Sequence, residues 1–263
     1  MEVEIIDSVF TVVNILRVFI IATISFFIAL LITPLWTKIL HKYNFAKKQI
    51  TREDVAPIFS ELHRKKQGTP TTGGVVIWGT VLIVTFGFWL LSQFPPLDFL
   101  SKLNFLSRAQ TLLPLGAFIV SAALGLFDDL WIIRGKGEKG RGLRMRDRIF
   151  MYILIGLGGA WWFYYKLGWD FINLPFLGDV IIGPWYILFF TFVILASAFS
   201  ANETDGLDGL LGGVALTIFA ALGVIAFVQE RMDLVVFIAA IIGSLVAFLW
   251  YNIYPAKFFM GDT

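Results

Sequence analysis

Three carboxylates and two glycines fall within the eight residues Asn202-Glu-Thr-Asp-Gly-Leu-Asp-Gly209, between apolar runs at about 184–201 and 210–228. Asp205 and Asp208 are three residues apart, so in a helical turn they share one face. The glycines let the backbone bend or let a ligand come close. This pattern predicts a membrane-embedded site that handles a phosphate ester through a divalent cation. The alternative is that one of the aspartates only caps the next helix.

A second candidate is the pair Asp128-Asp129, at the end of an apolar run. Adjacent carboxylates at a membrane boundary repel each other unless a cation lies between them. Mg²⁺ is a hard ion that favours carboxylate and phosphate oxygens. The alternative is a solvated acidic helix end, but acids at a helix C-terminus oppose the helix dipole. The pair therefore favours a functional role.

Three further polar groups lie near the same predicted boundary. Asp262 follows the last apolar run, with Asn252 ten residues earlier. The stretch from Lys65 to Gly74, which includes Lys66 and Thr71, combines cations, hydroxyls and glycines before a predicted helix, a setting that suits a phosphate. A basic anchor followed by a Pro/Gly turn explains that stretch equally well.

Basic residues also mark helix ends. Arg146 and Arg148 come just before another apolar run, where they could hold an anionic lipid or a diphosphate, or only set topology. Arg17, near the outer end of the first apolar run, is expected to snorkel toward the interface.

The elements that must position these residues are membrane helices. The chain is 58% hydrophobic and 15% charged, whereas soluble domains are usually about 25% charged. Several runs reach the roughly 20 apolar residues that span a bilayer, and none shows the short alternating strands of a β-barrel. There is no cysteine and hence no disulfide framework. The acidic N-terminus predicts no cleavable signal peptide.

We therefore predict an all-α, polytopic transmembrane helical bundle that forms a single integral membrane domain over residues 1–263. About seven spans are expected, at about 18–40, 73–91, 111–127, 149–167, 184–201, 210–228 and 234–254, and a surface hairpin at about 168–183.

The distribution of basic residues predicts the topology. Loops at about 41–72 and 128–148 carry seven Lys or Arg each, whereas the opposite loops carry only Lys102, Arg108 and Arg231. The positive-inside rule places loops 41–72, 128–148, 202–209 and 255–263 in the cytoplasm and the N-terminus outside. All the candidate clusters fall on this predicted cytoplasmic face.

Four blocks of the chain resemble the bacterial phospho-N-acetylmuramoyl-pentapeptide transferases, within the polyprenyl-phosphate N-acetylhexosamine-phosphate transferase (glycosyltransferase 4) superfamily. They occur in the family's order and span the chain: Lys66-Gln-Gly-Thr-Pro-Thr71 with Gly73-Gly74, Gly125-Leu-Phe-Asp-Asp129, Asn202-Glu-Thr-Asp-Gly-Leu-Asp-Gly-Leu210 and Asn252-Ile-Tyr-Pro-Ala-Lys-Phe-Phe-Met-Gly-Asp262.

The resemblance implies a reaction at the cytoplasmic face of the bacterial inner membrane. Undecaprenyl phosphate attacks UDP-N-acetylmuramoyl-pentapeptide, UMP leaves and lipid I of peptidoglycan synthesis forms, with Mg²⁺ neutralising the diphosphate. It also implies a homodimer in a lipid bilayer and no nucleic-acid partner.

The resemblance implies roles for individual residues as well. Asp128 would deprotonate the lipid phosphate or act as nucleophile. Asp129 would support the metal region, and Asp262, with Asn202 as a second candidate, would ligate the metal. The residues expected to bind or position the substrate are Lys66, Thr71, Asn202, Asp205, Asp208, Asn252, Arg146 and Arg148.

Some positions depart from the family. Ile132 replaces an expected lysine, Glu203 replaces an apolar residue, and Arg146 and Arg148 match only with a two-residue insertion. The family has ten spans and a later histidine-rich loop, so the chain is interpreted as C-terminally truncated and its own activity is left open.

Two other functions stay under consideration. A sister transferase would use UDP-N-acetylglucosamine instead. A membrane transporter would also be polytopic with intramembrane carboxylates, but such residues usually lie near the midplane within repeats, whereas the carboxylates here fall at predicted span ends.

Overall fold

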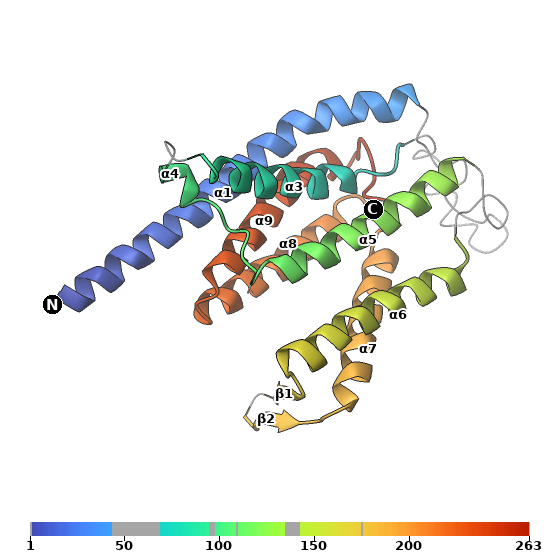
Figure 1. Ribbon diagram of the computed structural model, residues 1–263. Coiled ribbons are helices and arrows are strands. Elements are labelled where there is room, and N and C mark those ends of the chain that lie inside the picture. Colours follow the sequence, from blue (N-terminus) through green and yellow to red (C-terminus); the bar gives the residue numbers. More distant parts are fainter. Residues whose placement is uncertain are drawn as a thin grey trace. The chain divides into compact units, whose positions relative to one another are not determined.

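The fold is almost entirely helical. The computed structural model describes residues 2–43, 69–94, 98–108, 110–134, 143–174 and 176–262, with side chains for all of these except 2–11 and 98–99. Figure 1 shows the elements in order: α1 (Glu2–Lys42), α3 (Gly74–Leu91), α4 (Asp98–Ser101), α5 (Leu112–Ile133), α6 (Met145–Trp161), a π-helical turn (Trp162–Lys166), β1 (Phe171–Leu174), β2 (Gly178–Ile181), α7 (Trp185–Thr204), α8 (Leu210–Val228) and α9 (Met232–Asn252).

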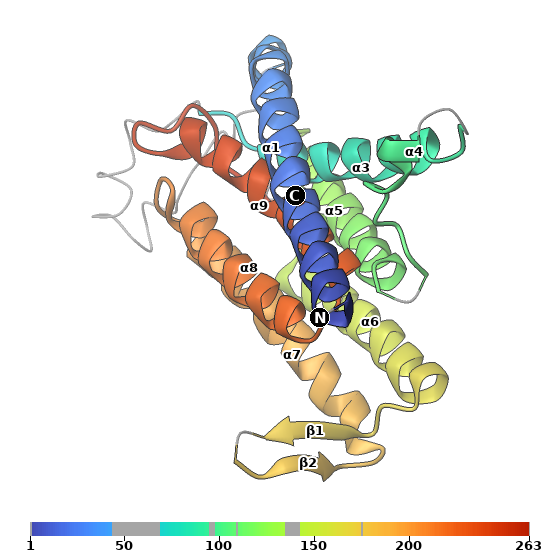
Figure 2. The ribbon, with the colours of Figure 1, turned by 90° about the vertical axis from the view of Figure 1, so that its left-hand side faces the viewer.

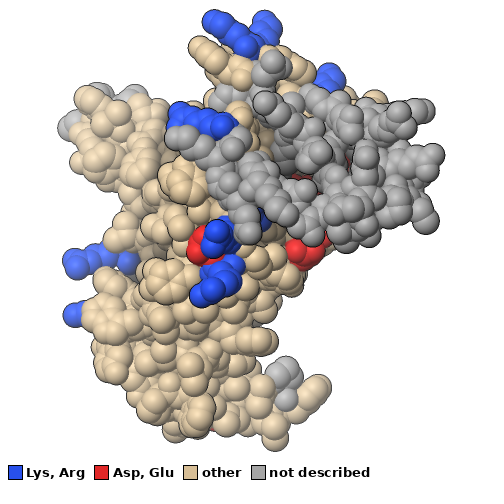
Figure 3. Space-filling view, turned by 90° about the vertical axis from the view of Figure 1, so that its right-hand side faces the viewer, with Lys and Arg blue, Asp and Glu red and all other residues tan. Residues whose placement is uncertain are grey.

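Six of the described helices are long and apolar enough to cross a membrane, namely α1 from Val12 onward, α3, α5, α7, α8 and α9. The prediction of an all-α polytopic bundle is confirmed. The remaining predicted span, about 149–167, is a helix, but α6 has 17 residues before the π-helical turn begins. Most of the described surface in Figure 3 is neither acidic nor basic, as expected of helices that face lipid.

Two predicted boundaries need correction. α1 is a single helix from Glu2, far ahead of the predicted start at Val18. α5 continues to Ile133, so Asp128 and Asp129 lie inside the helix rather than at its end. The physical reason is that the next four residues, Leu130-Trp-Ile-Ile133, are apolar and include no glycine or proline to break the helix.

The chain divides into two compact units, each described by itself. The first unit comprises Met1–Asp129 and Gly206–Thr263, and the second comprises Leu130–Asp205.

α9 is the central helix of the first unit. It contacts α1, α3 and α8, and most of its side chains are buried. The α1–α9 crossing is so close that a Cβ on Gly243 would overlap the carbonyl oxygen of Ala22. Such close backbone approach at small residues is how helices associate in lipid, where the hydrophobic effect gives them no drive to pair.

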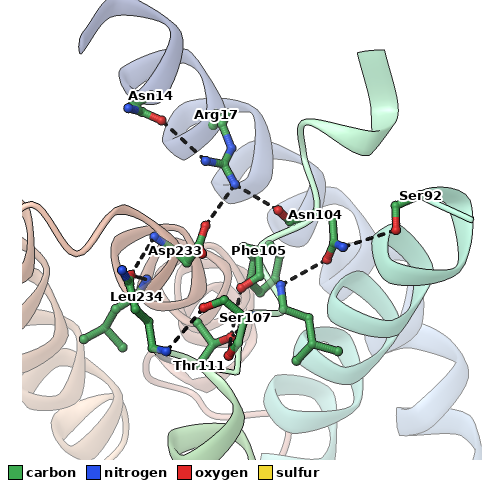
Figure 4. A network of polar contacts seen from close by, with 11 residues as sticks. Asn14, Arg17, Ser92, Asn104, Phe105, Ser107, Thr111, Asp233 and Leu234 are labelled. Carbon is green, nitrogen blue, oxygen red and sulfur yellow. Dashed lines mark hydrogen bonds and ion pairs between the residues drawn. The ribbon is translucent and has the colours of Figure 1, made fainter. Parts of the chain in front are cut away.

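One polar network lies at the N-terminal end of α9 (Figure 4). The Arg17 guanidinium donates to the Asn104 carbonyl at 3.0 Å and to Oδ1 of Asp233 at 3.3 Å. Gln110 accepts from the backbone N–H of Asp233 at 3.2 Å. Arg17 was predicted to snorkel, but its side chain is only 15% exposed and forms an ion pair. We call these residues, with Asn14, the Arg17 network.

The second unit packs α6 against α7, with the β1–β2 hairpin joining them. A Cβ on Gly156 would lie 3.0 Å from Thr191, so the two helices approach closely there. The strands are antiparallel, with Ile172 opposite Val180 and Asn173 opposite Asp179. This hairpin confirms the turn structure predicted for about 168–183.

Candidate active site

The first part of the candidate site is the paired aspartate of α5. Asp129 is fully buried and Asp128 is 4% exposed. Carboxylates are very rarely buried to this extent unless they are paired or ligate a metal. Both carboxylates have polar partners, and their burial marks this turn of α5 as the centre of the candidate site.

The segment 258–262, which follows α9 and is called the returning segment here, packs against the start of α3 beside this pair. The backbone N–H groups of Gly73 and Gly74 donate to the carbonyls of Phe259 and Met260 at 2.8 and 2.9 Å, and Phe259 N–H donates to Pro70 at 2.8 Å. Phe258 is fully buried between Phe248 and Tyr251. These contacts fix the segment from 258 to 260 against residues 70–74.

The sequence block that ends at Asp129 and the block that ends at Asp262 come together at Gly261. The backbone N–H of Asp262 donates to Oδ2 of Asp129 at 3.1 Å. Gly261 has φ of 80°, and a Cβ there would lie 2.5 Å from Oδ2 of Asp129 and 2.8 Å from the Thr72 nitrogen. Only glycine fits this left-handed, crowded position. We call Asp128, Asp129, Gly261, Asp262, Thr71 and Thr72 the acidic site.

Thr71 and Thr72 line the site from the α3 side. Both are buried, and Thr72 has φ of 72°, an uncommon conformation for a β-branched residue. The Thr72 carbonyl accepts from the indole of Trp36 at 3.0 Å. Among the described residues, the Thr71 hydroxyl has no hydrogen-bond partner. A buried orphan hydroxyl is a group that a ligand or water would satisfy.

Asn252 and Asp208 hold the backbone that carries Asp262. The Asn252 amide accepts from Gly209 N–H at 3.0 Å and donates to the Phe258 carbonyl at 2.9 Å. Asp208 Oδ2 accepts from Ala256 N–H at 3.2 Å. Both residues were predicted to bind substrate. That role stays a prediction, and the geometry gives each a positioning role.

The capping alternative for Asp205 and Asp208 is wrong. α8 begins after Gly209, which is the N-cap residue with φ of 77° and without a side-chain cap. Asp205 is instead the C-cap residue of α7, and its N–H donates to the Asn202 carbonyl at 3.3 Å. The reason is that the backbone before α8 adopts a positive φ at the N-cap position, which glycine reaches more readily than aspartate does.

The other predicted residues belong to parts of the chain that are described separately. Asn202, Asp205, Arg146 and Arg148 belong to the second unit. Arg146 is exposed and Arg148 half-buried on the first turn of α6, and residues two apart on a helix do not face each other. Lys66 lies outside the described residues. The roles predicted for all five stay predictions.

Comparison with known proteins identifies the family. The model described as "Glycosyl transferase family 4" matches residues 111–263. The chain belongs to glycosyl transferase family 4. The resemblance drawn from the four sequence blocks is thereby confirmed, and the acidic site is a feature of a family 4 protein.

Two similar curated proteins have the same name. The chain is 32% identical over 253 residues to the phospho-N-acetylmuramoyl-pentapeptide-transferase of Chloroflexus aurantiacus (strain ATCC 29366 / DSM 635 / J-10-fl), covering 94% of this chain and 63% of that protein. It is 33% identical over 241 residues to the protein of the same name from Listeria monocytogenes serovar 1/2a (strain ATCC BAA-679 / EGD-e), covering 91% and 68%. The chain thus spans about two thirds of the length of these relatives. It is a multi-pass membrane protein with bacterial relatives.

The donor chemistry of this family 4 site suits Mg²⁺. Within the described part of the chain, no three Asp, Glu or His side chains gather closely enough to hold an ion. Mg²⁺ commonly takes only one or two protein carboxylates and completes its shell with substrate phosphates and water. Asp128 and Asp129 are the two carboxylates of the acidic site on α5 that could serve as such ligands.

Sequence reasoning gave no role to Thr72, Trp36, Phe258 or Gly261. Gly261 had a visible signal, since it lies directly before a candidate aspartate. The others act through backbone groups or packing, and no side-chain pattern in the sequence distinguishes them.

Proposed function

We propose that the protein is a phosphoglycosyl transferase that moves phospho-N-acetylmuramoyl-pentapeptide from its UDP conjugate to undecaprenyl phosphate. The products are lipid I, a peptidoglycan precursor, and UMP. The observation that carries the proposal is the junction of the buried Asp128-Asp129 pair with Gly261-Asp262 in a family 4 member. The names of the relatives support the choice of substrates.

The chemistry is the transfer of a sugar-phosphate group from a nucleoside diphosphate to a lipid monophosphate. An oxygen of the lipid phosphate attacks the sugar-bound phosphorus, a new P–O–P bond forms, and the bond to UMP breaks so that UMP leaves with the bridging oxygen. Asp128 takes the proton from the lipid phosphate or acts as a transient nucleophile. Asp129 and Asp262, with Asn202 as a further candidate, would hold Mg²⁺, which neutralises charge on the diphosphate when bound.

The remaining side chains have binding and positioning roles. The buried Thr71 hydroxyl is suited to donate to a phosphate oxygen. Asn252 and Asp208 hold the returning backbone so that Asp262 stays against Asp129. Lys66, Asp205, Arg146 and Arg148 are proposed to contact the anionic substrates.

We further propose that the acidic site faces the cytoplasm of a bacterium and that the N-terminus lies outside. The excess of Lys and Arg in loops 41–72 and 128–148 supports this orientation. In this orientation the acidic site faces the compartment that supplies the nucleotide-sugar.

The decisive experiment measures UMP release by the full-length protein in detergent. UDP-N-acetylmuramoyl-pentapeptide and prenyl phosphate are supplied with and without Mg²⁺, to wild type and Asp128→Asn. Release should require both Mg²⁺ and the lipid, and the substitution should lower it roughly 100-fold or more, as loss of an acid–base group does. Asp147→Asn on the exposed first turn of α6 is the matched control and should stay near wild type.

Two results would contradict the proposal. Turnover of UDP-N-acetylglucosamine instead of the muramoyl substrate would assign the sister transferase. No UMP release from either nucleotide-sugar, with a folded protein, would reject the transferase reaction itself.

A further inference from the structure

The β1–β2 hairpin of the second unit presents large apolar side chains at its tip. Phe176, which adopts a positive φ between the strands, is fully exposed, and Leu177 is 76% exposed. Two strands of four residues cannot bury such side chains by themselves. Exposed apolar clusters of this kind usually mark a surface that meets something else.

The base of the hairpin is held firmly to the helices. Trp169 stacks on Phe171 at 5.8 Å between ring centroids and meets Phe163 edge-on at 5.4 Å, while Phe163 lies against Phe190 of α7. The backbone N–H groups of Ile182 and Gly183 both donate to the Asp170 carbonyl at 2.8 Å. The direction in which the tip points is therefore set by α6 and α7, as Figures 1 and 2 show.

The two faces of the hairpin differ in polarity. One face pairs Ile172 with Val180 and continues to Leu174, so it is apolar throughout. The other face carries the Asn173–Asp179 pair near the tip, where the Asn173 amide donates to Asp179 at 2.7 Å, and the Phe171–Ile181 pair at the base. An element with an apolar tip, one apolar face and a polar pair on the other face fits a boundary between water and hydrocarbon.

The neighbours of the hairpin place it at such a boundary. Trp185, the first residue of the apolar helix α7, is 71% exposed and lies four positions after the end of β2. At the other end of the hairpin, the end of α6 and the π-helical turn expose Trp161, Trp162 and Tyr165. Trp and Tyr are enriched where membrane helices cross the interface.

We propose that the hairpin tip inserts into the membrane interface, with Phe176 and Leu177 among the acyl chains near the headgroups. α7, which follows the hairpin in the chain, exposes further apolar side chains, including Leu188 and Phe192. A lipid surface is favoured over a protein partner because the cluster is aromatic and aliphatic and is flanked by interfacial aromatic residues. The inference does not depend on the proposed reaction.

The chain contains no cysteine, so single-cysteine labelling is direct. Phe176→Cys and Leu177→Cys are made in the full-length protein, spin-labelled and reconstituted in vesicles of phosphatidylethanolamine and phosphatidylglycerol. For each spin label, the accessibility to oxygen, which concentrates in lipid, is compared with the accessibility to a water-soluble nickel chelate. Leu188→Cys on the exposed face of α7 is the lipid control, and Glu230→Cys in the exposed α8–α9 turn is the water control.

Both hairpin labels should resemble the label at 188, with an oxygen-to-nickel accessibility ratio several-fold above that at 230. A ratio like that at 230 would place the tip in water and overturn the proposal. Labels shielded from both reagents would show that protein covers the tip and would overturn it as well. Two positions guard against a local disturbance at either one.

Discussion

Polar groups lie at both ends of α9, partly buried at the N-terminal end and buried at the C-terminal end, and their partners differ in kind. At the N-terminal end, Arg17 and Asp233 offset each other's charge and the surrounding amides and carbonyls complete the network. At the C-terminal end, a pair of buried carboxylates meets the backbone N–H of a third aspartate. The difference teaches that the first end joins two helices through an ion pair, whereas the second joins a carboxylate to the backbone of a distant segment, which is the arrangement that the proposed reaction uses.

The comparison predicts that changes at the acidic site remove activity and that changes at the Arg17 network remove stability. The largest expected effect is that of Gly261→Ala, because the new Cβ would press on Asp129 and adopt a strained φ. UMP release should fall roughly 100-fold, as expected when a site is displaced by about 1 Å.

The matched control is Gly213→Ala in α8, where a Cβ would have open space. It should release UMP at the wild-type rate. If Gly261→Ala keeps wild-type activity, the close approach of Gly261 and Asp129 is not needed for the reaction.

The next largest effect is expected for Asn252→Ala. It removes two hydrogen bonds from buried backbone groups of Gly209 and Phe258, which should lower the free energy of unfolding by about 2–3 kcal/mol. Activity should fall with it, roughly tenfold, because the returning segment then holds Asp262 less firmly. Thermal unfolding in detergent and UMP release measure the two effects.

Asn173→Ala on the exposed hairpin is the control, and should change the free energy of unfolding by no more than about 0.5 kcal/mol. Asn252→Asp keeps the acceptor for Gly209 and loses the donor to Phe258, so it should lie between wild type and alanine. An Asn252→Ala protein of wild-type stability would show that these bonds contribute little.

The smallest effect is expected at the Arg17 network. Arg17→Met should lower the free energy of unfolding by about 1–2 kcal/mol, since the ion pair is partly exposed, and should leave UMP release per folded molecule unchanged. Asp233→Asn and the double variant complete a double-mutant cycle that measures the coupling.

Arg231→Met, which alters an exposed neighbour of Asp233, should be neutral. A loss of activity in Arg17→Met at unchanged stability would break the comparison, because it would join the two ends of α9 in one function.

Much of the fold was predictable because a bilayer imposes a simple rule on sequence. Runs of about 20 apolar residues mark the spans, and four of the six membrane helices, α3, α7, α8 and α9, begin and end within a few residues of the predicted positions. The exceptions are α1, which begins earlier than predicted, and α5, which ends later. The juxtaposition of α5 with the C-terminal block followed from topology, since both lie on one predicted face.

The detailed geometry of the site was not predictable. The bonds between residues 70–74 and 258–260 join backbone groups far apart in the chain, and no residue type signals them. The pairing of Arg17 with Asp233 required knowing which helices neighbour each other, because an arginine near a span end can equally well reach the interface alone. The positioning role of Asn252 was hidden for the same reason.

The polar attachments at both ends of α9 have a consequence for how the protein sits in lipid. Its 21 residues span about 31 Å, close to the thickness of a bilayer's hydrocarbon core. A helix tied to α1 through Arg17 at one end and to the Gly209 and Phe258 backbone at the other cannot tilt alone to match a thinner or thicker membrane. Hydrophobic mismatch would therefore strain the acidic site itself, and acyl-chain length becomes a variable that acts on the reaction.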